Sequence, residues 1–145
     1  MLKIIAAFDG LKYSLQTQEY AISLASKNKA LLVGVFLNNL NYHSYKIYDI
    51  ISEKEGGIDA KLQGKLNKKD NFARAKAIKT FESACRKAGI QFSVHSDEFA
   101  AIRELIGESI YADLLVISRN ETFNRYKEEL PTSFIHGFLP HVQCP

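Results

Sequence analysis

Four short apolar segments alternate along the chain with longer stretches in which apolar residues recur at helical spacing. The segments 3–8, 30–37 and 113–117 are almost continuous in aliphatic side chains. Such continuity is typical of parallel strands that helices cover on both faces. In the segment 91–95 apolar and polar residues alternate, and we therefore predict that this strand lies at an edge of the sheet.

The stretches between the strands predict helices over 14–27 and 70–88, a third that begins after Ser96-Asp97, and a weaker one over 133–139. Alternating strands and helices predict right-handed crossovers and an α/β fold. We expect a doubly wound, mostly parallel, Rossmann-like sheet with helices on both faces. Ligands of such sheets bind beyond the carboxyl ends of the strands, where the strand order reverses.

Residues 38–66 interrupt this alternation with about thirty residues of little periodicity, which is longer than an ordinary connection in an α/β fold. The insert, as we call this segment, groups the rings of Tyr42, His43, Tyr45 and Tyr48. Three interpretations are open: a lid, an interface, or a short helix folded over the sheet.

Composition and charge exclude several classes of protein. Of the 145 residues, 46% are hydrophobic, which fits one domain with a sizeable core. The net charge of +3, with the lysine-rich stretch 61–69 expected to be solvated, argues against a nucleic-acid partner. No apolar run reaches the roughly 20 residues of a membrane helix, and the N-terminus has the pattern of a first strand. We therefore expect a cytoplasmic protein.

Neither a metal site nor a catalytic group emerges from the sequence. Cys85 and Cys144 are far apart and match no metal-ligand spacing. His136 and His141 are five residues apart, which aligns them poorly on a helix. Because nucleophile and phosphate-loop motifs are also missing, we predict no catalytic residues, no metal and no enzymatic activity.

The ordered set of segments resembles the universal stress protein family. The first strand ends in Asp9-Gly10, and the second reads Ala30-Leu31-Leu32-Val33-Gly34-Val35-Phe36. The fourth strand, Asp113-Leu114-Leu115-Val116-Ile117, and the closing Ser133 to Cys144-Pro145 continue the likeness, which covers the chain except the insert. The resemblance implies a parallel sheet of order 3-2-1-4-5, a cytoplasmic location and a homodimer.

In that family Cys-Pro leads directly into the fifth strand, whereas this chain ends at Pro145. We therefore expect a single domain over 1–145 with strand order 3-2-1-4, its fifth strand missing or truncated. We infer that the chain is the first module of a tandem pair. Its partner is then a second stress-protein domain of the full-length chain, or a second copy.

Nucleotide-binding members of the family carry a glycine motif after strand four, where backbone amides approach phosphate oxygens and a final hydroxyl donates to them. Here the glycine positions hold Ser118, Glu121 and Thr132, and only Ser133 keeps the hydroxyl. Each lost glycine adds a Cβ, and Glu121 adds a carboxylate where a triphosphate carries its charge. The sequence therefore argues against ATP held in the family's usual manner.

The resemblance also directs attention to the turn after the first strand. In nucleotide-binding relatives the residues around this Asp contact the adenine and ribose, which makes candidates of Ala7, Phe8, Asp9, Gly10 and Val35. Local chemistry offers another role, in which Asp9 caps the next helix or shapes the Asp-Gly turn. Both roles stay open at this point.

Two functions follow from the sequence. The first is a non-enzymatic regulatory or interaction module of the stress-protein type, with no cofactor. The alternative is a protein that binds ATP or AMP, with or without slow ATP hydrolysis, through a phosphate loop rebuilt from Ser118, Thr132, Ser133 and nearby basic side chains.

Overall fold

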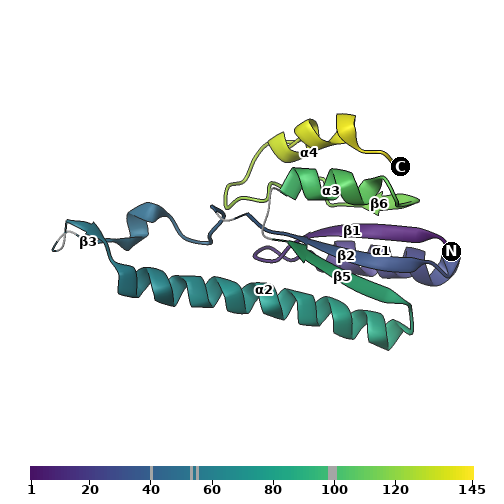
Figure 1. The fold of residues 1–145 in the computed structure, drawn as a ribbon, viewed down its shortest axis with the longest axis horizontal. Helices are drawn as coiled ribbons and strands as arrows, with labels where there is room; N and C mark the ends of the chain where they lie inside the picture. The colour runs from purple at the N-terminus through teal and green to yellow at the C-terminus, as the bar shows by residue number, and fades with distance from the viewer. Residues whose placement is uncertain (40, 53, 55, 98–100) are drawn as a thin grey trace.

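The computed structural model describes residues 1–39, 41–52, 54, 56–97 and 101–145. Its central sheet contains β1 (Lys3–Asp9), β2 (Leu31–Leu37), β5 (Phe92–Asp97) and β6 (Leu114–Val116) (Figure 1). Every strand pair is parallel, and the order is β5-β2-β1-β6. The predicted order 3-2-1-4 is confirmed, with the alternating third strand at the edge.

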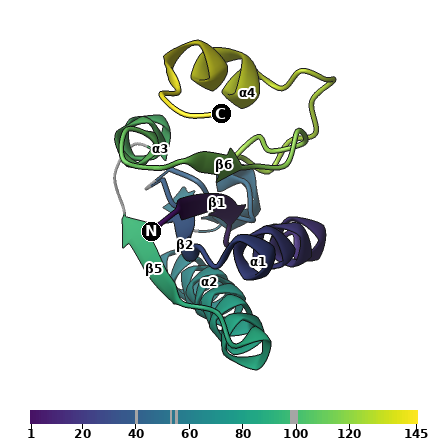
Figure 2. The same cartoon turned by 90° about the vertical axis from the view of Figure 1, so that its right-hand side faces the viewer.

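Helices cover both faces of this sheet, as Figure 2 shows. On one face lie α1 (Leu15–Asn28) and α2 (Ala60–Ala88), and on the other α3 (Ala101–Ser109) and α4 (Ser133–Phe138). A short helical turn, η2 (Leu139–His141), follows α4. Successive β1 residues alternate between the two cores, so both faces need apolar side chains. This is why β1 and β2 lack the polar alternation of a half-solvated strand.

The helix boundaries follow from local capping. The Ser14 side chain accepts a hydrogen bond from the Thr17 amide at the start of α1. The α2 helix ends at Gly89, whose φ of +67° closes the last turn in the left-handed region. At the end of the chain, the Leu115 amide donates to the Pro145 carbonyl over 2.8 Å, which places Pro145 beside β6. That the family's fifth strand is missing or truncated in this chain stays a prediction.

The insert is shorter than the sequence indicated. It contains a helical turn, η1 (Ile47–Ile50), and a small antiparallel pair of strands, β3 (Ile51–Ser52) and β4 (Gly57–Ile58). The prediction of irregular structure up to residue 66 is wrong for 60–66, because Asp59 caps α2 by accepting from the Leu62 amide. The first turns of α2 extend beyond the sheet (Figure 1), so they need no long apolar stripe.

Aromatic rings fill the core between the sheet and the pair α1 and α2. The Phe81 ring lies 5.3 Å from the Phe8 ring and 5.8 Å from the Phe36 ring, measured between centroids. This packing depends on Gly34 in the middle of β2. A Cβ at Gly34 would lie 2.7 Å from a ring carbon of Phe81, which is closer than real contacts allow.

Gly34→Ala should therefore destabilise the protein by about 1–3 kcal/mol, the usual cost of overpacking a core. The matched control is Gly64→Ala in α2, where a new Cβ meets no atom within 4 Å. That change should be neutral or stabilise by up to about 1 kcal/mol, because alanine favours the helix. Urea denaturation of the two variants decides the matter, and equal stability of both would contradict this account of the core.

Candidate functional site

The sheet order reverses at β1, which has β2 on one side and β6 on the other. The carboxyl ends of β1 and β6 therefore open onto the same crevice, where α/β proteins bind their ligands. The two segments that leave these strands are the turn after Asp9 and the loop from Ser118 to Thr132. Both were singled out in the sequence.

The Asp9 carboxylate is buried and fully engaged within the protein. One oxygen, Oδ1, accepts from the backbone amides of Leu11 (2.8 Å) and Lys12 (3.3 Å), which shapes the Asp-Gly turn. The other, Oδ2, accepts from the Tyr42 hydroxyl over 2.7 Å. The structural role expected of Asp9 is therefore present, and its outward oxygen is covered by a side chain of the insert.

Tyr42 is a site residue that the sequence reasoning did not assign to Asp9. Its carbonyl accepts from the Arg74 guanidinium over 2.7 Å, so α2 holds it in place. Burial and the neighbouring charge of Asp9 raise the pKa of the Tyr42 hydroxyl, which therefore stays a proton donor. The only sequence signal was the cluster of rings in the insert.

The other residues predicted to contact adenine and ribose do not form one site. Ala7 and Val35 face the core under α3 and α4, whereas the Phe8 side chain lies in the opposite core. Arg74 packs on Gly10, where a Cβ would come within 3.0 Å of the Arg74 Cγ. The structure thus brings Asp9 and Gly10 to the crevice but buries the side chains of the three apolar candidates.

Glu121, at the predicted second glycine position, is buried beside Asp9. It is 5% exposed, and burial together with the charge of Asp9 raises its pKa to about 8, with Lys12 acting in the opposite direction. At neutral pH this carboxyl is mainly protonated. The expectation that Glu121 repels a triphosphate by its charge is therefore weakened.

Thr132, at the predicted third glycine position, and Ser133 both make hydrogen bonds within the protein. The Thr132 hydroxyl donates to the Glu121 carbonyl over 2.6 Å and accepts from the Ile135 amide, which caps α4. The Ser133 amide (3.0 Å) and hydroxyl (2.6 Å) both donate to one carboxylate oxygen of Glu128. These bonds lower the pKa of Glu128. The amide and hydroxyl of Ser133 are therefore already bonded to a carboxylate of the chain.

The remainder of the loop is held by short polar contacts and one strained residue. Ser118 accepts from the Asn120 amide over 3.3 Å, and Lys12 donates to the Thr122 hydroxyl over 2.9 Å. Phe123 has a φ of +50°, a left-handed conformation that favours glycine. Its ring lies 4.3 Å from that of Phe134, so burial of the ring offsets the backbone strain. The loop keeps a glycine-like turn without a glycine.

A cavity of about 330 Å³ lies at the carboxyl end of β2, between Leu37, Tyr42, Phe123 and Phe134. None of the sequence-predicted candidates lines it. Within the described residues, no group of three His, Cys, Asp or Glu side chains is placed to hold a metal ion.

No sequence-family profile matches the chain, and no curated protein matches it in sequence. Solved structures do match over nearly all of its length. A universal stress family protein from Burkholderia pseudomallei is 17% identical, with a TM-score of 0.56, covering 99% of this chain and 91% of its own. UspA from Lactobacillus plantarum is 12% identical, with a TM-score of 0.63 and coverages of 99% and 93%.

A third match is a universal stress protein in complex with cAMP, 16% identical, with a TM-score of 0.60 and coverages of 99% and 92%. At these identities the likeness concerns the arrangement of strands and helices. The chain therefore has the fold of the universal stress proteins along nearly its whole length.

Proposed function

We propose that the chain is a universal stress protein-like regulatory or interaction module that is not an enzyme and does not hold ATP through its phosphate loop. One observation carries the proposal: Glu128 accepts from both the amide and the hydroxyl of Ser133. A phosphate would have to displace this carboxylate and then lie beside its negative charge.

The covered state of Asp9 supports the same conclusion. Its oxygens are satisfied by two backbone amides and the Tyr42 hydroxyl. A ribose or adenine that reached Asp9 would have to break the bond to Tyr42 and move part of the insert. Displacing a buried hydrogen bond without replacing it costs about 1–3 kcal/mol.

The alternative function is binding of a nucleotide with few phosphates, and one observation favours it. A structural neighbour is described in complex with cAMP. The cavity of about 330 Å³ at the end of β2 is at the lower limit of small-molecule sites. AMP or a cyclic nucleotide therefore stays the second candidate, and ATP the less favoured ligand.

Partner and location remain proposals. We propose a homodimer, or pairing with a second stress-protein domain in a longer chain, and a cytoplasmic location. No helix in the described part of the chain has both the length and the apolar character needed to cross a membrane.

A thermal-shift series with ATP, AMP and cAMP tests the function. We expect no shift with ATP at millimolar concentration, whereas a ligand at about 100 times its dissociation constant adds about 2.7 kcal/mol. If ATP does stabilise the protein, Ser133→Ala identifies the loop as its site, with Ser83→Ala on the exposed face of α2 as control. ATP binding lost in Ser133→Ala alone would overturn the proposal.

The environment of Glu121 predicts a pH dependence of stability. The unfolded carboxyl ionises near pH 4.5 and the folded one near pH 8, so the folded state binds more protons between these values. The contribution of Glu121 to stability should therefore fall as pH rises from about 5 to above 8, by on the order of 4 kcal/mol.

Urea denaturation of the wild type and Glu121→Gln at pH 5.5, 7 and 8.5 measures this. The variant should lose less stability than the wild type over the series, because glutamine does not ionise. Glu129→Gln, which changes an exposed carboxylate in the same loop, is the control and should follow the wild type. Parallel curves for Glu121→Gln and the wild type would contradict a buried neutral Glu121.

A further inference from the structure

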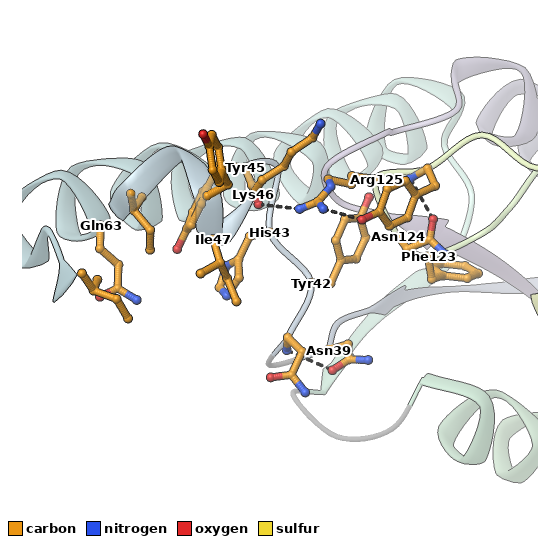
Figure 3. Close-up of a pocket in the computed structure, with 15 residues that line it drawn as sticks. Asn39, Tyr42, His43, Tyr45, Lys46, Ile47, Gln63, Phe123, Asn124 and Arg125 are labelled. Carbon is orange, nitrogen blue, oxygen red and sulfur yellow. Dashed lines mark hydrogen bonds between the residues drawn. The ribbon is translucent and has the colours of Figure 1, made fainter. Parts of the chain in front are cut away.

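A second cavity, of about 660 Å³, lies between the insert and the loop after β6 (Figure 3). None of Asp9, Glu121, Thr132 and Ser133 lines it. Its walls come from residues 39–63 on one side and 123–126 on the other. Its volume is that of a site for a drug-sized molecule.

Aromatic rings form much of the wall: Tyr42, His43, Tyr45, Tyr48, Phe123 and Tyr126. Several are fixed by contacts with one another or with residues outside the cavity. The His43 and Tyr45 rings stack at 4.8 Å, and the Tyr45 hydroxyl bonds to Asn67 of α2. Tyr42 is held by Asp9. The cavity is therefore formed before any ligand arrives, which reduces the entropy lost on binding.

The charged residues of the cavity share one sign, whereas its amide side chains both donate and accept hydrogen bonds. Four amide side chains line it, from Asn39, Asn41, Gln63 and Asn124. The charged lining residues are the cations Lys46 and Arg125; among the described residues around the cavity, no carboxylate contributes to the wall. This composition favours a ligand with negative charge and hydrogen-bond acceptors.

Arg125 is the most strongly positioned of these groups. Its guanidinium donates to the Tyr45 carbonyl over 3.0 Å and to the Tyr126 hydroxyl, and lies 4.7 Å from the centre of the Tyr126 ring. Its Nε is buried and has no hydrogen-bond partner within the described structure. A buried donor of this kind is costly unless an acceptor reaches it. Arg125 therefore offers a cation held in a fixed position in the wall of the cavity.

The rim exposes large apolar side chains. Tyr48 is 82% exposed, Ile47 67% and Tyr126 57%, and all three belong to the lining. A flat apolar ligand seated between them would remove this surface from water. Stacking on the rings and burial of the rim favour an aromatic body over an aliphatic one.

We propose that this cavity binds a flat aromatic molecule that carries a negatively charged group, with Arg125 and Lys46 facing the anion and the tyrosine and histidine rings facing the aromatic body. The charged group is a carboxylate or a monophosphate, since a guanidinium recognises both. The cavity shares residues 123–126 with the loop after β6, but Ser118, Glu121, Thr132 and Ser133 lie outside its lining.

Isothermal titration calorimetry of the full chain with three probes tests the class of ligand. The probes are 2-naphthoate, the neutral 2-naphthamide, and cyclohexanecarboxylate, which keeps the charge but lacks the rings. We expect 2-naphthoate to bind about tenfold or more tightly than either of the others, because a charge-assisted hydrogen bond and ring stacking each add to affinity. Equal affinities for all three, or no binding of 2-naphthoate, would overturn the proposal.

Variants then locate the site. Arg125→Gln should weaken 2-naphthoate about tenfold and leave 2-naphthamide almost unchanged, whereas Lys127→Gln, two residues away and outside the cavity, should change neither. Because Arg125 also holds Tyr45, Lys46→Gln serves as a second variant that removes a charge without that contact. If neither cation variant affects 2-naphthoate, the cavity is not its site.

AMP distinguishes the source of the anion and separates this proposal from the function proposed above. AMP binding that falls in Arg125→Gln and persists in Ser133→Ala would assign a monophosphate to this cavity. Binding of 2-naphthoate but not AMP would assign an aromatic carboxylate. AMP binding lost only in Ser133→Ala would support the phosphate loop, and together with silent naphthoate titrations it would reject the cavity.

Discussion

The buried Asp9 carboxylate is the constraint on which the arrangement around the crevice depends. A carboxylate removed from water must find hydrogen-bond donors within the protein. The turn of Leu11 and Lys12 supplies two, and Tyr42 supplies the third from a segment more than thirty residues away. The insert is thereby attached to the end of β1.

Two residues of α2 add further hydrogen bonds to the insert. The Asp70 carboxylate accepts from the Ser44 amide over 3.0 Å and from the Ser44 hydroxyl, and Arg74 donates to the Tyr42 carbonyl. Arg125 adds a bond from the loop after β6 to the Tyr45 carbonyl. Three parts of the chain therefore close around the insert, and the cavity of about 660 Å³ is the space they leave.

The fold could be predicted from the sequence because its signals are local. The continuous aliphatic residues of β1 and β2 indicate strands buried on both faces of the sheet. Gly89 indicates the end of α2. The first ten residues of α2 were missed because they extend beyond the sheet and lack an apolar stripe. The turn role of Asp9 could be predicted for the same local reason, since its amide partners follow it directly.

The contacts that decide the site are not local. The bond from Tyr42 to Asp9 and the pair of bonds from Ser133 to Glu128 join side chains with no periodic relation in the sequence. The pKa of Glu121 likewise depends on burial, which the identity of the residue does not reveal. The assignment of Ser118, Glu121 and Thr132 to glycine positions stays a prediction, and the sequence did not reveal that Ser133 bonds to Glu128.

The length of α2 has a mechanical consequence. Its 29 residues span about 44 Å as one uninterrupted rod. The hairpin of β3 and β4 precedes its outer end, and Asp70 and Arg74 lie further along the same rod. A force or a protein that tilts the outer end of α2 must therefore displace Asp70 and Arg74 together, and with them the hydrogen bonds that hold the insert.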